Sequence, residues 1–400
     1  MAKLKSANIG DVHINAKGLP LTQLIEEIEG VFVSFVVQNR PDYIVINGDL
    51  FHNEIRTNSD ACAYVLSLVY RLACLKSHQG NTVQLFIVDG TQSHDMFQNK
   101  MFTFLVDSPL HNVKIIYTAE VVEFMGEKLL FLPDEYVADP EAHFGPFINV
   151  PPNTYAHIYM HGVCDNFGAV IIGDQMDKIN KEMHRFLFPF EQMCSIAKYG
   201  CIDNHYHRYT VMPSSNGNGQ VIVVGSFARW VHGEEEAKGF LSSTIDYDSN
   251  SCTNRFVENH KASIYLTRDI RDFMNTESQL SDIGSEVELF MQRNQVKSLR
   301  LFVPFELTDN ETVRAASDIF ANKGVVFKYE KGGSDRTKDK DDDKTSSINS
   351  FVGVVANCTD IHTNIARFIE YDDNGASVTD DVMTPSTDKV GWVKSVLFNL

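Results

Sequence analysis

The sequence predicts an α/β fold, on two observations. Over the first 240 residues, short apolar runs rich in β-branched residues each end in a cluster of Asp, His, Gly or Asn. Runs of about five such residues bounded by turn formers are typical of buried strands. Between the first runs, Leu21 to Gln38 and Ser59 to Lys76 carry apolar residues at three- and four-residue intervals, which predicts helices. Strands that alternate with helices indicate an α/β core.

The polar clusters stand where the predicted strands end. The runs and the residues that follow them are KSANIG before Asp11 and His13, DYIVIN before Asp49, VQLFIVDG before His94 and Asp95, AHIYM before His161, and QVIVVGS before Arg229. In open α/β sheets the ligand site lies at the carboxyl ends of the strands. We therefore expect these clusters to gather around one site.

We expect four regions along the chain. Residues 1–255 would form the main domain, and residues 256–330 a small α+β capping domain with three strands and two helices. Its helical patterns are Leu280 to Arg293 and Asn310 to Asn322. Residues 331–347 contain no apolar residue and predict a flexible acidic linker. Residues 348–400 regain amphipathic character, which predicts a helical segment that binds a partner.

Composition and charge narrow the class of protein. No run approaches the ~20 apolar residues that span a bilayer, and the N-terminus turns polar too early for a secretory signal. We expect a cytoplasmic protein without membrane contact. The seven cysteines form no CxxC pair, which predicts reduced thiols. The formal net charge of -18 argues against a broad basic surface that coats nucleic acid, although cations bound in a cleft would change the local potential.

The clusters contain the ligands of a two-metal hydrolase. Such a site needs carboxylates and imidazoles from several loops, with one carboxylate bridging the ions. Asp11 and His13 are two residues apart, so in an extended segment both would point the same way. His205 and His207 have the same spacing, and we expect their imidazoles to point at one place. Asp49, directly after a strand and a glycine, is the natural bridging carboxylate.

The ordered series resembles a known signature. DVH, GDLFH, SHD, MHG and NHYH are similar to the DxH, GDxx(D/H), GNHD, H and GHxH motifs of calcineurin-like phosphoesterases. The stretch VVGSFARWVHGEEEAKGF at 223–240 resembles SbcD-type DNA nucleases, as does GDLFH at 48–52. The resemblance covers roughly residues 1–245 and implies a metallophosphoesterase β-sandwich flanked by helices.

The resemblance also implies roles for individual residues. Asp11, His13, Asp49 and His207 would hold one divalent ion, and Asp49, His161 and His205 the second, with Mn²⁺ as the expected metal. His94 would protonate the leaving oxygen or stabilise developing charge, and Asp95 would orient His94. His52 and Arg229 are candidates for substrate binding, and for Arg229 we weigh equally an ion pair with Glu234 or Glu235 that braces a loop.

Two motifs depart from the family pattern. In place of GNHD the chain has GTQSHD, with two extra residues and no Asn for the second ion. Thr91, Gln92, Ser93 or a water would have to replace the Asn. In place of GHxH the chain has NHYH, and we expect Asn204 to preserve the turn because Asn tolerates left-handed backbone.

The resemblance implies a Mn²⁺-dependent DNA exonuclease and endonuclease that hydrolyses phosphodiesters with a metal-activated water. It would be the nuclease subunit, acting as a dimer, of an SbcCD-like repair and recombination complex with an SMC-like ATPase of the SbcC type, and the capping domain at residues 256–330 would also bind DNA. One alternative is a phosphatase or cyclic-nucleotide phosphodiesterase of the same superfamily, which the acidic charge favours. Another is a scaffold whose metal site has decayed, as the altered GTQSHD loop suggests.

Overall fold

The computed structural model describes residues 3–106, 108, 111–166, 186–274, 280–294, 296–320 and 324–330. The chain divides into two compact units, Met1–Lys331 and Gly332–Leu400, and every described residue belongs to the first. The linker predicted at 331–347 and the partner-binding segment predicted at 348–400 lie outside the described residues. Among the described helices, none is long and apolar enough to cross a membrane. The described cysteines form no disulfide.

The first sheet has six strands in the order β14-β13-β1-β2-β3-β4. They are β1 (Lys3–Ile9), β2 (Tyr43–Asn47), β3 (Gln84–Val88), β4 (Asn112–Ile116), β13 (Gly239–Asp246) and β14 (Ser251–Glu258). Strands β1 to β4 are parallel, while β13 and β14 add antiparallel pairs at one edge. The strands predicted before Asp11, Asp49 and His94 are confirmed. Since β14 runs to Glu258, the sheet continues past the expected domain boundary at residue 255.

The second sheet also has six strands, in the order β11-β12-β10-β7-β6-β5. They are β5 (Glu120–Phe124), β6 (Glu127–Leu132), β7 (His157–His161), β10 (Cys201–Asn204), β11 (Thr210–Pro213) and β12 (Gln220–Val223). Its centre, from β6 through β7 and β10 to β12, is parallel. The strands predicted before His161 and Arg229 are confirmed. A separate short pair joins β8 (Val163–Cys164) to β9 (Leu187–Phe188).

The two sheets pack face to face, because alternate residues of their strands enter one common core. This core contains Tyr43 and Phe86 from the first sheet and Phe131, Tyr159 and Ile202 from the second. Tyr43 and Tyr159 also share a hydrogen bond of 2.9 Å between their hydroxyls. The other face of each sheet packs against helices, so strands such as β2 are buried on both sides.

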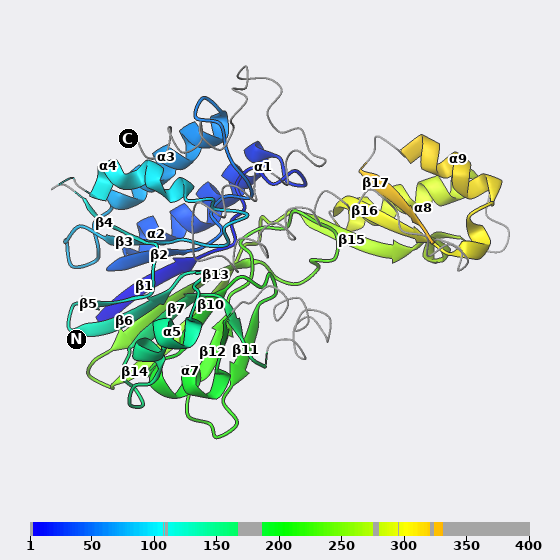
Figure 1. Cartoon of the computed structure of the whole chain (residues 1–400). Helices are drawn as coiled ribbons and strands as arrows, with labels where there is room; N and C mark the ends of the chain where they lie inside the picture. Colours follow the sequence, from blue (N-terminus) through cyan, green and yellow to red (C-terminus); the bar gives the residue numbers. More distant parts are fainter. Residues whose placement is uncertain are drawn as a thin grey trace, which may run out of the picture. The chain divides into compact units, whose positions relative to one another are not determined.

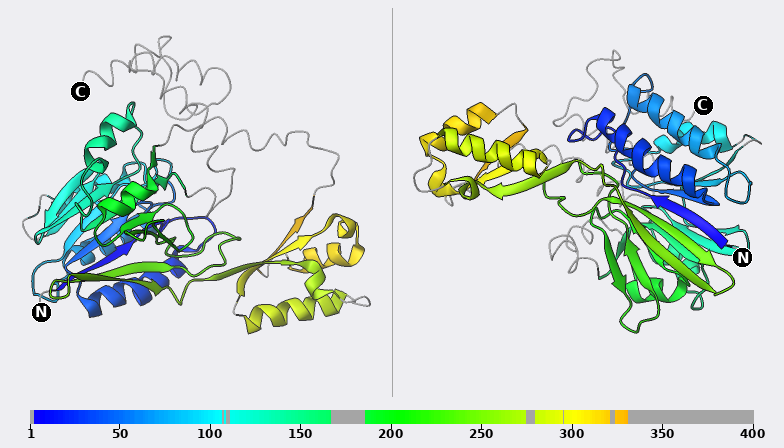
Figure 2. Two further views of the ribbon diagram at one scale, coloured as in Figure 1. Left: turned by 90° about the horizontal axis from the view of Figure 1, so that it is seen from below. Right: turned by 180° about the vertical axis from the view of Figure 1, so that it is seen from behind.

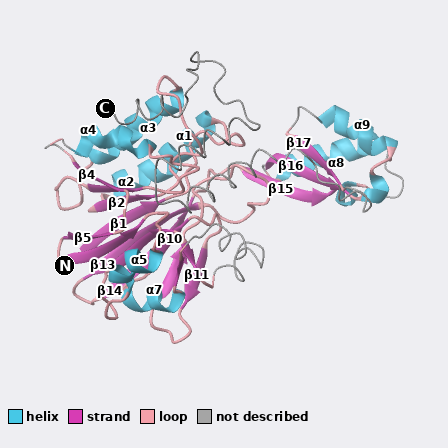
Figure 3. Ribbon diagram, in the orientation of Figure 1, coloured by secondary structure: helices cyan, strands magenta, loops and turns pink. Residues whose placement is uncertain are grey.

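Helices cover the outer faces of the sandwich (Figure 1, Figure 3). The first sheet carries α1 (Leu21–Glu27), the π-helix η1 (Ile28–Val33), α2 (Ser34–Asn39), α3 (Asp60–Ala73), the 3₁₀ helix η2 (Gln98–Phe102) and α4 (Thr103–Val106). The second carries α5 (Pro140–Ile148) and α7 (Phe190–Ile196). The view from behind in Figure 2 shows the same layers. The predicted arrangement of a β-sandwich flanked by helices is confirmed.

Local sequence explains where two of these helices begin and end. Helix α3 begins after Ser59, whose hydroxyl accepts a hydrogen bond of 3.2 Å from the Cys62 amide. Such a cap satisfies an amide that the first turn would leave unpaired. Helix α2 ends at Asn39, and the next residue, Arg40, has a φ of 48° and is followed by Pro41. A left-handed residue and a proline both stop helix propagation.

A three-stranded sheet with its own core follows the sandwich in the sequence. Its strands are β15 (Ile264–Asp269), β16 (Val296–Val303) and β17 (Val325–Tyr329), and its helices are η4 (Ile270–Phe273), α8 (Leu280–Arg293), η5 (Phe305–Leu307) and α9 (Glu311–Phe320). The three strands and both predicted helices are confirmed. However, all three strands are parallel, so this part is α/β and the expected α+β arrangement is wrong. Helical connections between successive strands impose the parallel order.

Candidate metal centre

The candidate ligands leave the strand ends of both sheets. Asp11 and His13 follow β1, Asp49 follows β2, His161 ends β7, and His205 and His207 follow β10. Main-chain hydrogen bonds tie the first two loops together: the Asp11 amide donates to the Gly48 carbonyl at 3.1 Å, and the His13 amide to the Asp49 carbonyl at 3.1 Å. The two sheets are joined at the same place, where the Asn47 side chain donates to the Met160 carbonyl. The site therefore lies across the sandwich.

The first group consists of Asp11, His13 and His207, whose ligand atoms lie within 4.8 Å of one another. His13 Nε2 is 3.0 Å from His207 Nε2, which in turn is 4.0 Å from Asp11 Oδ1. Asp49 Oδ2 is 4.0 Å from His13 Nε2. Donors about 2.1 Å from one ion can be at most about 4.2 Å apart. These separations thus suit a single cation shared by all four residues.

One buried oxygen supports a cation at this place. Asp11 is fully buried, and its Oδ2 accepts hydrogen bonds from the His205 amide at 3.0 Å and the Asn204 side chain at 3.3 Å. Its Oδ1 has no hydrogen-bond partner among the described residues. Burial raises the pKa of Asp11. A buried carboxylate oxygen left unpaired is costly, and a cation would compensate for it.

The second group consists of Asp49, His161 and His205. Asp49 Oδ1 lies 3.4 Å from His161 Nε2. The other ring nitrogen of His161 is 3.0 Å from the Asn47 carbonyl, to which it can only donate, so in the neutral ring the lone pair falls on Nε2 and faces the group. The two oxygens of Asp49 therefore face different groups, as a bridging carboxylate requires. The spacing of His205 and His207 predicted that both imidazoles point at one place, and this prediction is wrong. His207 belongs to the first group and His205 to the second.

The loops reach this geometry through left-handed backbone and not through extended segments. Asp11, His13 and Asp49 have φ values of 46°, 52° and 48°, and His205 has 135°. The extended conformation expected for Asp11 and His13 is therefore wrong, although their side chains do converge. Asn204 was expected to supply a left-handed turn, but it ends β10. Its side-chain carboxamide donates to Asp11 and accepts from the side chains of Asn8 and Asn47.

Burial and neighbouring charges set the protonation of the ligands. Burial alone would raise the pKa of Asp49, but the charge and hydrogen bond of His161 and the charges of His13 and His94 together outweigh burial and hold that pKa below its usual range. Burial opposes the proton on His161, yet Asp49 raises the pKa of His161 well above its usual value. Burial lowers the pKa of His13 well below its usual value, which favours the neutral, metal-binding form.

Glu234 orients His207 and was not predicted as part of the site. Its Oε1 is 2.6 Å from His207 Nδ1, which leaves Nε2 of that ring to face His13. Lys238, also buried, donates to the His207 carbonyl at 2.7 Å and lies 3.8 Å from Glu234 Oε2. The signal was present in the GEEEAKGF stretch, but sequence alone gave no reason to pair these residues with His207.

His94 and His52 join His13 in a third cluster of ligand atoms. The ring centroids of His94 and His52 lie 4.8 and 5.3 Å from that of His13. His94 Nδ1 donates to the His52 carbonyl at 2.6 Å, a contact that fixes the imidazole. Trp230 packs on the His52 ring at a centroid distance of 4.7 Å and was also not predicted.

Asp95 was predicted to orient His94, but its hydrogen bonds among the described residues go elsewhere. It is fully buried and accepts hydrogen bonds from the amides of Phe51 at 3.0 Å and Gly90 at 2.7 Å. Burial, together with the charge of Asp49, raises the pKa of Asp95 to about 8. Asp95 thus fastens the loop that follows β3 to the loop that follows β2. His94 is held instead by the His52 main chain.

Arg229 is directed at the main chain. Its guanidinium donates to the carbonyls of Glu234 at 2.8 Å, Glu236 at 2.5 Å and Ser263 at 3.3 Å, with weaker contacts to Glu235 and Ala262. This agrees with the expectation that Arg229 braces a loop, through carbonyls and not through the carboxylates. The braced loop is the one that carries Glu234.

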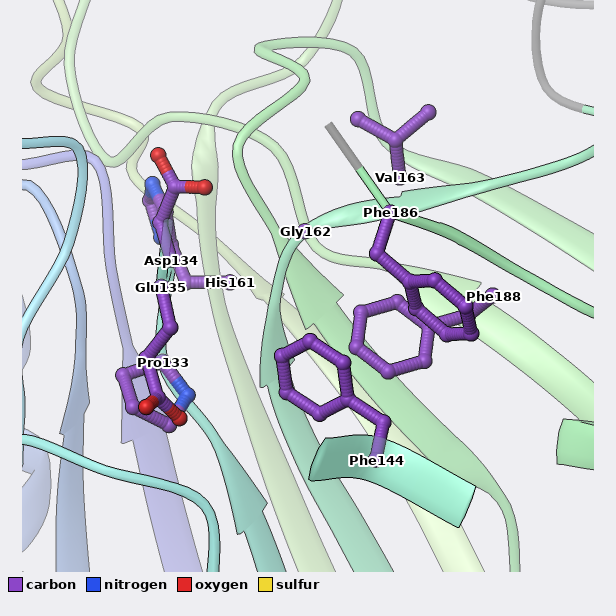
Figure 4. A pocket seen from close by; sticks show the side chains of 9 residues that line it. All are labelled: Pro133, Asp134, Glu135, Phe144, His161, Gly162, Val163, Phe186 and Phe188. Atoms are coloured by element: carbon purple, nitrogen blue, oxygen red, sulfur yellow. The ribbon is translucent and has the colours of Figure 1, made fainter. Parts of the chain in front are cut away.

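A small pocket lies beside the second group (Figure 4). Figure 4 shows Phe144, Phe186 and Phe188 on one side and Pro133, Asp134 and Glu135 on the other, next to His161. The charge of Asp134 contributes to the raised pKa of His161, after the larger effect of Asp49. The pocket therefore has aromatic side chains on one side, and acidic groups together with His161 on the other.

Comparisons with known proteins give weak matches. No family model and no curated protein matches the chain. A crystal structure of a single mutant of Vps29 from Entamoeba histolytica is similar at 12% identity and a TM-score of 0.26, covering 63% of this chain and 99% of that one. Wild-type Vps29 from the same organism, in complex with Zn²⁺, is similar at 11% identity and a TM-score of 0.25, and the match covers 64% of this chain and 100% of that one. These matches are too weak to assign a family.

Proposed function

We propose that this protein is a phosphoesterase that uses two divalent metal ions. The observation that carries the proposal is Asp49, whose two oxygens face two separate groups of ligands. Asp and His donors suit Mn²⁺, Fe or Zn²⁺. Ions held there would act as Lewis acids toward a phosphate and make water a better nucleophile at neutral pH.

The chain's own residues supply orientation and a proton. Glu234 holds His207, and the Asn47 carbonyl holds His161, so each imidazole presents Nε2 to its group. His94 is fixed through Nδ1, which leaves its Nε2 to hold a proton for the leaving oxygen. His52 and Trp230 line the same side of the cluster and are placed to contact substrate.

More finely, we propose that the substrate is DNA, cut by exonuclease and endonuclease activity with Mn²⁺. Support comes from the 223–240 stretch, which carries the resemblance to SbcD-type nucleases and also supplies Glu234, Lys238 and Trp230 to the site. A dimer and an ATPase partner of the SbcC type, bound through residues 348–400, complete this proposal. The net charge of -18 favours a small phosphate ester, so a phosphatase or cyclic-nucleotide phosphodiesterase is the second candidate.

A substrate comparison tests the proposal. With Mn²⁺, the purified full chain should cut a linear DNA duplex faster than a small phosphomonoester, and Asp49→Asn should abolish cutting because it removes the bridging charge. Asp248→Asn removes the same charge from an exposed turn and should leave the rate unchanged. Faster hydrolysis of the monoester would favour the phosphatase. Full activity in Asp49→Asn would remove the proposed site, and a chain that takes up no transition metal would be a scaffold.

A further inference from the structure

We infer that the Thr91 side-chain hydroxyl is a ligand of the second metal ion, taking the place of the carboxamide that GTQSHD lacks. The inference rests on the two-ion site proposed above. It concerns a residue that the resemblance does not assign, because the matching motif has Asn at that point. Thr91 directly follows Gly90 in the loop after β3.

The hydroxyl lies among the donors of the second group. Thr91 Oγ1 is 3.5 Å from His161 Nε2, and it is 3.3 Å from Asp49 Oδ2, the oxygen that also lies 4.0 Å from His13 Nε2. Donors about 2.1 Å from one ion, at angles of 90° to 110°, are separated by about 3.0 to 3.4 Å. The measured separations are close to this range. A hydroxyl oxygen is also a hard, neutral donor of the kind that Mn²⁺ accepts.

The main chain fixes Thr91 in this place. Its amide donates to Asp49 Oδ1 at 2.7 Å, and its carbonyl accepts from the amides of His94 and Asp95, both at 2.9 Å. A Cβ at Gly90 would lie 2.1 Å from the Asp49 amide nitrogen, so only glycine lets the loop approach so closely. Thr91 is 8% exposed, so nearly all of its surface is covered by protein.

The other candidates in the loop point elsewhere. Gln92 and Ser93 are both exposed, whereas Thr91 is buried. The two extra residues of GTQSHD therefore lie on the outside of the loop. They lengthen the connection to His94 without displacing the first residue after Gly90, which keeps its contact with Asp49.

Calorimetric titration of the metal-free full chain with Mn²⁺ alone tests the inference. Wild type should bind two ions. Thr91→Val keeps the shape but removes the oxygen, so the second affinity should fall about ten- to hundredfold, the range seen when a metal site loses a supporting group. The first affinity should stay within about threefold. Thr91→Ser and Thr91→Asn, which both supply an oxygen, should bind the second ion far more tightly than Thr91→Val.

The controls separate coordination from folding and from the wider proposal. Gln92→Ala and Ser93→Ala should bind both ions as wild type does. If either control lowers the affinity for the second ion while Thr91→Val does not, the inference is wrong. Equal weakening of both ions in Thr91→Val also overturns it, because a disturbed Asp49 would affect both groups. Wild type that binds fewer than two ions overturns the inference whatever its activity. Two bound ions without hydrolysis would refute the proposed function alone.

Discussion

Replacing Glu234 by Gln should weaken the binding of the first metal ion and leave the binding of the second unchanged. Glu234 is 7% exposed, and its Oε1 lies 2.6 Å from His207 Nδ1. Burial opposes its charge, but the hydrogen bond from His207 and the charge of Lys238 lower the pKa of Glu234, so the carboxylate is ionised at neutral pH. Gln has the same size and keeps an acceptor oxygen. The substitution therefore removes charge and little else.

The size of the effect follows from this one contact. A hydrogen bond to a charged group contributes roughly 1.5–3 kcal/mol, and one between neutral groups about 0.5–1.5 kcal/mol. The difference of about 1–1.5 kcal/mol corresponds to roughly a five- to tenfold loss of affinity. The loss should fall on the ion bound by His207, since His161 is oriented separately by the Asn47 carbonyl. Lys238 stays paired with Glu236, 3.8 Å away, which limits the loss of stability.

Titration with Mn²⁺ measures both affinities in one experiment. The matched control is Glu235→Gln, which removes the same charge from the next residue; Glu235 is exposed and pairs with Arg268 at 3.2 Å. This control should bind both ions as wild type does. The reasoning is refuted if Glu234→Gln binds the first ion unchanged, or if the control weakens that ion equally, since bulk charge and not the His207 contact would then be responsible.

Two further predictions concern catalysis and acid stability. His94→Ala should lower the rate of phosphate ester hydrolysis by about 10²–10⁴ while Mn²⁺ binding stays within about threefold; parallel kinetics and titration would expose an equal loss of metal. Burial lowers the pKa of His157 to about 4 from 6.5, so as pH falls through this window the unfolded chain takes up the proton first. In urea unfolding, the stability of wild type relative to His157→Gln should be about 2 kcal/mol lower at pH 5 than at pH 7.5, and an equal pH dependence of the two proteins would contradict this prediction.

The features that the sequence predicted correctly are those that short-range patterns determine. The strand ends before Asp11, Asp49 and His161 were recoverable because each apolar run and its polar terminus are adjacent in the chain. Parallel strands bring their carboxyl ends to one edge, so the convergence of Asp11 and Asp49 followed from the topology of the first sheet, whereas His161 joins them from the second sheet. The identity of the candidate ligands therefore needed no knowledge of distant contacts.

What the sequence missed depends on contacts between remote segments. Glu234 meets His207 across 27 residues, and Asn204 meets Asp11 across 193. Nothing local separates these residues from other polar residues in loops. The spacing argument failed for a different reason: it assumed extended backbone, whereas Asp11 and His13 are left-handed. Side-chain direction in a turn cannot be obtained from the period of a strand.

The unusual backbone bears on how the site is built. Non-glycine residues with positive φ cost of order 1–3 kcal/mol each and persist where surrounding contacts over-determine them. Asp11, His13 and Asp49 all have positive φ, and their loops exchange main-chain hydrogen bonds of 2.9 to 3.1 Å. Those bonds and the flanking buried strands hold the ligands in position through the protein alone. A cation entering such a site meets donors already oriented, so its binding energy is not consumed in ordering them.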